Sequence, residues 1–84
     1  MWVQGQKAVG AALAAARKRA GLTQVQLATR LAKPQSFVSN YEKGQRRIDV
    51  LEMLRIAKAV KAEPQEILAN VIRRLKAGRR TGHR

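Results

Sequence analysis

Apolar residues recur at helical spacing in a short segment before the middle of the chain, residues 24–31, and polar residues fill the other face. Thr23 precedes the segment and Gln26 follows three residues later, which is the pattern of a capping box at a helix start. The pattern therefore predicts a helix over residues 24–31. The apolar positions of this pattern begin two residues before the helix and are Leu22, Val25, Leu27, Ala28 and Leu31.

A second short helix is predicted directly after the first. Pro34 favours a helix start and disfavours helical geometry at Lys33, so the chain is expected to turn at residues 32–33. The second helix then covers residues 35–43 and ends at Gly44, a residue suited to a C-cap. Its apolar side consists of Phe37, Val38 and Tyr41, and its polar side of Gln35, Ser36, Ser39, Asn40 and Lys43.

Two longer helices flank this pair. An Ala-rich stretch predicts a helix over residues 6–20 that ends at Gly21. Asp49 and Glu52 form a second capping pattern and predict a helix over residues 50–61. The broad apolar stripe of that helix consists of Val50, Leu51, Leu54, Ile56, Ala57 and Val60.

A last helix is predicted over residues 64–77, with Pro64 in its first turn. Because no strand-like alternation occurs, residues 1–77 are predicted to form one all-α domain of five helices. Residues 78–84 contain two glycines and no apolar side chain, so a flexible basic tail is expected there. His83 lies in this tail without a second ligand candidate, and neither a metal nor a cofactor site is expected.

The charge of the chain narrows the class of its partner. The sequence holds 18 Lys and Arg against 5 Asp and Glu, a formal net charge of +13 that is spread along the whole length. Such an excess predicts a polyanion as the partner. No apolar stretch has the length of a membrane span or the layout of a signal peptide, and no long apolar face is left for a membrane surface. A cytoplasmic protein is therefore expected, associated with the nucleoid if the polyanion is DNA.

The polar side chains of residues 35–43 indicate which polyanion is bound. Gln and Asn can donate and accept in one bidentate contact with adenine, and Ser can bond to a base edge or to phosphate. A face built only for solubility more often carries Glu and Lys, although a polar helix on a bundle surface stays the simpler alternative. Two short helices joined by a tight turn, with these side chains on the second, predict a helix-turn-helix that contacts DNA bases.

The chain resembles the Xre/Cro-type helix-turn-helix family, whose members share the lambda-repressor-like fold, over about residues 13–68. The resemblance rests on L-x-x-x-R-K-x-x-G-L-T-Q-x-x-L-A, then Q-S-x-V-S-x-Y-E-x-G, then L-R-I-A-K-A-V. Two positions depart from the family pattern. Ala32 stands where a turn glycine is common, and Pro34 stands where a Ser or Thr N-cap is usual.

This resemblance implies roles for particular residues. Arg17 and Glu42 are implied to form a structural ion pair that fixes the recognition helix, and Gln24 is implied to hold a DNA phosphate. The expected base contacts are Gln35, Ser36 and Asn40, with Ser39 and Phe37 as secondary candidates. The other expected phosphate contacts are Thr23, Lys33, Lys43, Arg46 and Arg47.

The helix over residues 64–77 carries more apolar residues than its own domain is expected to cover. The surplus predicts a homodimer seam, with coverage of the domain's own core as the alternative. The candidates for the seam are Leu68, Val71, Ile72 and Leu75.

These expectations combine into a sequence-specific regulator of transcription that binds double-stranded DNA as a homodimer on an inverted repeat. The resemblance also suggests autoregulation for so small a regulator. The alternative is an antitoxin-type interaction module, which would use the last helix and the tail to block a toxin. An enzyme is disfavoured because the acidic residues are scattered along the chain. RNA binding is disfavoured because only three aromatic residues could stack on bases. No small-molecule effector is evident.

Overall fold

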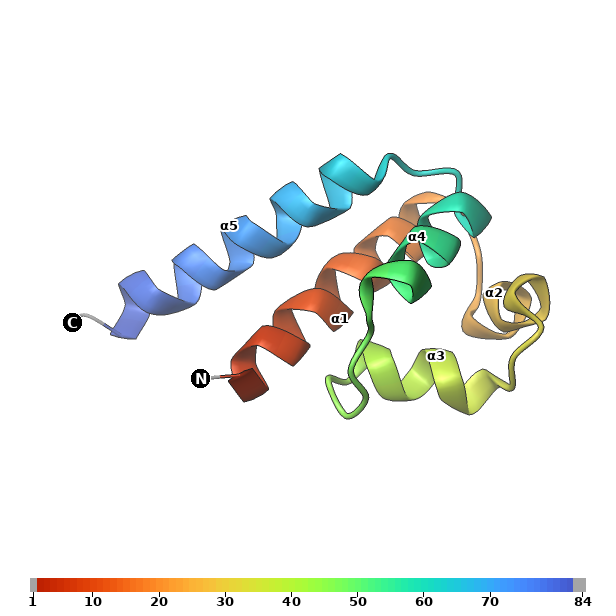
Figure 1. Cartoon of the computed structure of the whole chain (residues 1–84), viewed down its shortest axis with the longest axis horizontal. Coiled ribbons are helices and arrows are strands. Elements are labelled where there is room, and N and C mark those ends of the chain that lie inside the picture. Colours follow the sequence, from red (N-terminus) through yellow and green to blue (C-terminus); the bar gives the residue numbers. More distant parts are fainter. Residues whose placement is uncertain (1, 83–84) are drawn as a thin grey trace.

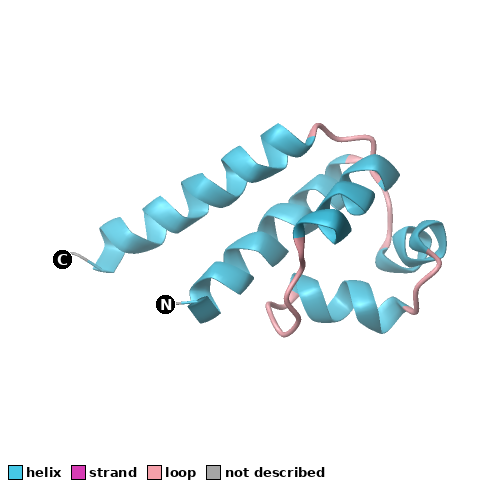
Figure 2. Ribbon diagram, in the orientation of Figure 1, coloured by secondary structure: helices cyan, strands magenta, loops and turns pink. Residues whose placement is uncertain are grey.

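The computed structural model describes the backbone of residues 2–82 and the side chains of residues 5–77. It contains five helices and, over that range, no strand, which confirms the predicted all-α class (Figure 2). In chain order the helices are α1 (Trp2–Arg19), α2 (Gln24–Leu31), α3 (Gln35–Glu42), α4 (Val50–Ala59) and α5 (Pro64–Gly82).

The two long helices, α1 and α5, lie alongside each other (Figure 1). Of the short helices, α3 packs against α1 and α2, and α4 packs against α2 and α5. The helix pair α2 and α3 projects to one side of this arrangement, joined by a tight turn (Figure 1). Where the helices meet, the largest fully buried side chains are Leu13, Leu27, Val38, Tyr41 and Ile56. Every helix except α5 supplies at least one of them, so burial of these residues holds α3 on the long helix α1 and holds α2 on α3 and α4.

Both predicted capping boxes are present. The Thr23 hydroxyl accepts from the Gln26 N–H at 3.1 Å, and the Gln26 side chain accepts from the Thr23 N–H at 2.9 Å. The Asp49 carboxylate accepts from the Glu52 N–H at 2.7 Å, and Glu52 accepts from the Asp49 N–H at 3.0 Å. These bonds satisfy N–H groups that a helix leaves unpaired at its start, and they place the first residues of α2 and α4 at Gln24 and Val50.

The turn between α2 and α3 contains a left-handed alanine. Ala32 has φ 56°, and the Lys33 N–H that follows it donates to the Ala28 carbonyl at 3.0 Å, the geometry of a Schellman motif. An alanine in this conformation costs about 1–2 kcal/mol because its Cβ approaches the next carbonyl. Pro34 then occupies the N-cap of α3 without a side-chain hydrogen bond, so its fixed φ replaces the usual capping side chain.

A glycine lets α1 approach α3 closely. A Cβ on Gly10 would overlap the carbonyl oxygen of Tyr41 and lie 2.9 Å from that of Glu42. The last turn of α3 therefore lies directly on the backbone of α1. This contact brings Glu42 toward the residues that follow Gly10 on the same helix.

Five helix boundaries differ from the prediction. α1 begins at Trp2 instead of residue 6, because one glycine in a good helix sequence costs only about 1 kcal/mol, and it ends at Arg19 instead of residue 20. α3 ends at Glu42 instead of residue 43. α4 ends at Ala59 instead of residue 61, because Lys61 adopts a left-handed φ of 57° and the Ala62 N–H closes the helix on the Ala57 carbonyl.

The fifth difference concerns α5, which continues to Gly82 where a flexible tail was predicted from residue 78. The glycine at 78 does not end the helix, since it lowers helix propensity without forbidding helical geometry. The expectation that His83 binds no metal concerns a residue outside the described part of the chain. No described helix has the length and apolar character needed to cross a membrane.

The predicted apolar stripe of α4 is only half correct. Ile56, Ala57 and Val60 are buried, whereas Val50, Leu51 and Leu54 are 68%, 71% and 42% exposed. At 100° per residue the six positions span about 220° of the helix, which is wider than one packed face. On α5, Val71 was expected at a dimer seam but is 6% exposed and packs in the protein's own core.

Candidate nucleic-acid interface

Helix α3 presents the side chains that were predicted to contact bases. Gln35, Ser36 and Asn40 are exposed, whereas Val38 and Tyr41 are buried on the opposite side. Phe37 and Ser39, the secondary candidates, are half-buried. The helix is therefore amphipathic, with one face in the core and one polar face available to a partner.

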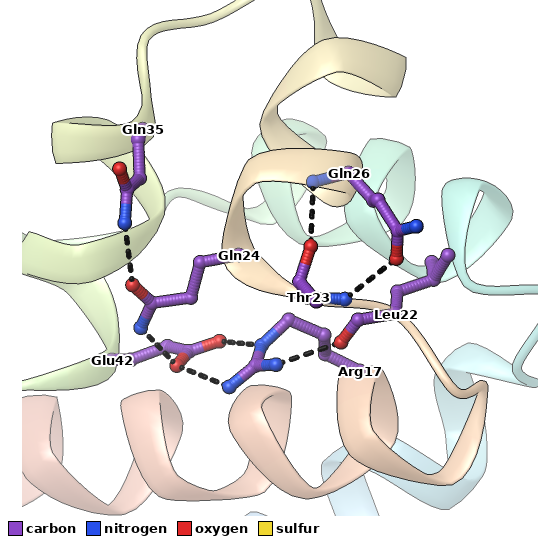
Figure 3. A network of polar contacts seen from close by, with 7 residues as sticks. All are labelled: Arg17, Leu22, Thr23, Gln24, Gln26, Gln35 and Glu42. Carbon is purple, nitrogen blue, oxygen red and sulfur yellow. Dashed lines mark hydrogen bonds and ion pairs between the residues drawn. The ribbon is translucent and has the colours of Figure 1, made fainter.

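The structure shows the expected pair of Arg17 and Glu42. Arg17 Nε donates to Glu42 Oε2 at 2.7 Å, and Arg17 Nη2 donates to Glu42 Oε1 at 3.1 Å, a bidentate arrangement (Figure 3). Arg17 Nη1 also donates to the Leu22 carbonyl at 2.7 Å. The two charged side chains are 10% and 8% exposed, and the hydrogen bond to Glu42 raises the pKa of Arg17 above its ordinary value. This guanidinium joins α1, the segment before α2, and the end of α3.

The hydrogen-bonded chain continues to the exposed surface of α3. Gln24 Nε2 donates to Glu42 Oε1 at 2.9 Å, and Gln35 Nε2 donates to Gln24 Oε1 at 3.3 Å (Figure 3). The Gln35 amide keeps its carbonyl oxygen and one N–H, which are the two groups that a bidentate contact with adenine requires. The sequence analysis predicted Gln24 as a phosphate contact and did not foresee that it bridges Glu42 to Gln35.

Tyr41 is a core residue, as expected. Its side chain is fully buried, and burial raises the pKa of its hydroxyl far above the ordinary value. Among the described residues the hydroxyl has no hydrogen-bond partner. Its ring meets the Phe37 ring edge-on, with 5.4 Å between centroids and an interplanar angle of 78°. Tyr41 therefore packs against Phe37 from the core side and does not offer a ring face to a base.

The cations predicted as phosphate contacts surround α3 but are not equivalent. Lys33, Lys43 and Arg47 are exposed, and no described side chain forms an ion pair with any of them. Arg46 is instead paired with Glu52, with 2.9 Å between Nη2 and Oε2. This pair was not predicted, because Glu52 was interpreted only as a capping residue.

The part of the chain that the structure describes holds no group of three or more His, Cys, Asp or Glu side chains able to bind a metal. The features of this surface are thus polar amides and hydroxyls on one helix, surrounded by cations. Such a surface is suited to base edges and phosphates.

Comparison with known proteins identifies the family. A helix-turn-helix family model matches residues 13–67. An XRE-family like protein from Pseudomonas syringae pv. tomato is 39% identical, with a TM-score of 0.71, over 80% of this chain and 82% of that one. The chain belongs to the Xre-type helix-turn-helix family. This membership confirms the lambda-repressor-like fold and makes the protein a DNA-binding transcriptional regulator.

Other solved structures agree with this assignment. The restriction-modification controller protein C.AhdI from Aeromonas hydrophila is 32% identical, with a TM-score of 0.68, over 74% of this chain and 94% of that one. The clp gene regulator ClgR from Corynebacterium glutamicum has a TM-score of 0.77 over 81% of this chain and 88% of that one. At 24% identity, ClgR supports the fold alone. No curated protein matches the chain.

Breaking the buried ion pair of this Xre-type protein from one side should destabilise it strongly. Arg17→Met or Glu42→Leu alone should lower the free energy of unfolding by about 3–5 kcal/mol, because each leaves one buried charge uncompensated. The double variant should recover much of this loss. Urea unfolding followed by circular dichroism measures all three variants.

Arg19→Met is the matched control, because it removes the same charge from an exposed position two residues further along α1. It should change the free energy of unfolding by no more than about 0.5 kcal/mol. Additive losses in the double variant of Arg17 and Glu42 would show that the two side chains do not interact.

Proposed function

We propose that the protein regulates transcription by binding a specific double-stranded DNA sequence as a homodimer, with α3 in the major groove. The observation that carries this proposal is the anchored amide of Gln35, which a buried ion pair holds in place through Gln24. A side chain that is fixed before binding loses less conformational freedom when it contacts a base. Membership in a regulator family supports the same conclusion.

Direct base contacts are assigned to Gln35, Ser36 and Asn40. They lie on exposed positions of one short helix, and an α-helix fits the width of the major groove of B-form DNA. Ser39 is half-buried and is assigned a secondary contact. The remaining amide groups of Gln35 suit adenine, and the Ser36 hydroxyl suits either a base edge or a phosphate.

Phosphate contacts are assigned on both sides of α3. Lys33 precedes the helix, and Lys43 and Arg47 follow it, all exposed and without ion-pair partners among the described residues. On the α2 side, Thr23 and Gln24 lie at the start of a helix, where the positive end of the helix dipole favours an anion. These contacts would set affinity and orientation, whereas the residues on α3 would set sequence preference.

A homodimer is proposed because one helix-turn-helix contacts too few base pairs to select one promoter in a genome. Leu68, Ile72 and Leu75 recur at helical spacing along α5 and are 50%, 44% and 38% exposed. Together they form an apolar stripe beside the buried Val71, and a second copy of the chain would cover them. Two copies related by a two-fold axis would bind inverted half-sites about 34 Å apart or a multiple of it.

Base contacts and phosphate contacts should respond differently to mutation. Duplexes selected from a random library supply the specific site, and a shuffled duplex supplies the reference. Asn40→Ala should weaken binding to the selected site by about 1–3 kcal/mol and leave binding to the shuffled duplex nearly unchanged. Fluorescence anisotropy titrations measure both affinities.

Ser36→Ala and Gln35→Ala extend the same measurement along α3. Equal losses on the selected and shuffled duplexes would remove these side chains from the base contacts. Selection that enriches no sequence at all would refute the proposed function.

Placing a charge on the proposed seam should separate the copies. Ile72→Glu should give a helical monomer, because it buries a carboxylate in the interface, and its affinity for the full site should fall to that for a half-site. Sedimentation on the full-length duplex measures the number of copies bound.

Leu54→Glu is the matched control, since Leu54 on α4 is exposed to a similar fraction, 42% against 44% for Ile72. It should remain a dimer. A monomer from Leu54→Glu and a dimer from Ile72→Glu would place the seam on α4, and a wild-type chain bound as one copy per site would refute the homodimer.

A further inference from the structure

We infer that Arg46 determines DNA sequence preference by positioning Phe37 on the recognition helix, and that it does not serve as a phosphate contact. The inference rests on the proposed function. It assigns different roles to Arg46 and Arg47, two adjacent arginines that have the same charge and nearly the same position. The inference is drawn from the groups that hold the Arg46 guanidinium in place.

The first group is the carboxylate of Glu52. Arg46 Nη1 donates to Oε1 at 3.1 Å and Nη2 donates to Oε2 at 2.9 Å, a bidentate fork. Nη1 also donates to the Arg47 carbonyl at 2.6 Å. An arginine side chain has five N–H donors, and Arg46 therefore makes three hydrogen bonds within the protein.

The second group in this arrangement is the start of α4, which fixes Glu52. Glu52 Oε1 accepts from the Asp49 N–H at 3.0 Å as part of the capping box, so the carboxylate that holds Arg46 is itself tied to the backbone. The hydrogen bonds from Arg46 and from the Asp49 backbone lower the pKa of Glu52. The fork is thus anchored to a helix terminus and not to a freely rotating side chain.

The third group is the ring of Phe37. The guanidinium carbon of Arg46 lies 4.6 Å from the ring centroid, within the range of a cation–π contact. The Phe37 ring packs edge-on against the buried Tyr41, four residues further along α3. Phe37 is therefore held between a core aromatic residue and Arg46, and Lys33 Nζ, at 5.5 Å from the centroid, adds a second cation.

These contacts predict different roles for the two arginines. The guanidinium of Arg46 is bound to Glu52 and on this inference contacts no phosphate, so removal of Arg46 should leave the number of phosphate contacts and the salt slope unchanged. The Glu52 carboxylate left without its partner should weaken binding to the selected and shuffled duplexes alike. Arg47 has no such carboxylate among the described residues, and its charge remains available to the DNA backbone. Phe37 lies between Gln35 and Asn40 in the sequence of α3, so displacement of its ring would alter the surface that meets the bases, including an apolar contact with a thymine methyl group.

The experiment compares Arg46→Ala with Arg47→Ala on the selected and shuffled duplexes over a range of salt concentrations. Arg47→Ala should lower the slope of log affinity against log salt by about one and leave the ratio of specific to shuffled affinity unchanged. Arg46→Ala should leave the slope unchanged and lower the ratio about tenfold. Arg46→Lys should not restore the ratio, because an ammonium group cannot form the bidentate fork.

Phe37→Leu links the loss to the ring. It should lower the ratio by itself, and Arg46→Ala added to Phe37→Leu should lower it no further, because the two residues act as one unit. Glu52→Gln, which weakens the fork without touching Arg46 or Phe37, should also lower the ratio. Thermal melting of every variant establishes that each is folded before its binding is compared.

A measurement without DNA separates this inference from the proposed function. Phe37 is the only phenylalanine in the chain, so its ring proton resonances are identified directly by NMR. They should shift in Arg46→Ala and Glu52→Gln but not in Arg47→Ala. Three results for Arg46→Ala would each overturn the inference: unchanged Phe37 ring resonances, a salt slope lowered by about one, or a loss of sequence preference that adds to the loss in Phe37→Leu. A wild-type chain without sequence preference would refute the proposed function, whereas the ring resonances would still decide whether Arg46 positions Phe37.

Discussion

The ion pair between Arg17 and Glu42 is the interaction on which the geometry of the recognition surface depends. Arg17 lies on α1 and holds both the end of α3 and the Leu22 carbonyl ahead of α2. Both side chains are almost fully buried, so removal of one partner would leave an uncompensated buried charge and destabilise the fold. Close contact of the helix backbones at Gly10 makes this short distance possible.

From this pair a series of polar contacts extends to the side chains that we propose contact DNA bases. Glu42 holds Gln24, and Gln24 holds the amide of Gln35 at the first turn of α3. Rigid placement of recognition groups favours specificity, because the wrong base cannot be accommodated by a simple rotation. The large positive charge acts separately, since long-range attraction to phosphates raises affinity for all sequences.

Much of this arrangement follows from local sequence. The capping boxes at Thr23 and Asp49 fixed the starts of α2 and α4, because their partners lie only three residues away. Arg17 and Glu42 were paired by family resemblance and not by spacing. The pairing of Arg46 with Glu52, the burial of Val71 and the exposure of the first turn of α4 were missed, since each depends on how helices pack in space and no local pattern specifies it.

The central claim is that the Arg17 and Glu42 pair orients the recognition helix as well as stabilising the fold. The most direct test is the ratio of specific to shuffled DNA affinity for the Arg17→Met/Glu42→Leu double variant, measured below its melting temperature. If the claim is correct, the folded variant binds shuffled DNA like the wild type but loses at least about tenfold of its preference for the selected site, because Gln24 and Gln35 lose their anchor. A folded double variant that keeps the wild-type ratio would contradict it.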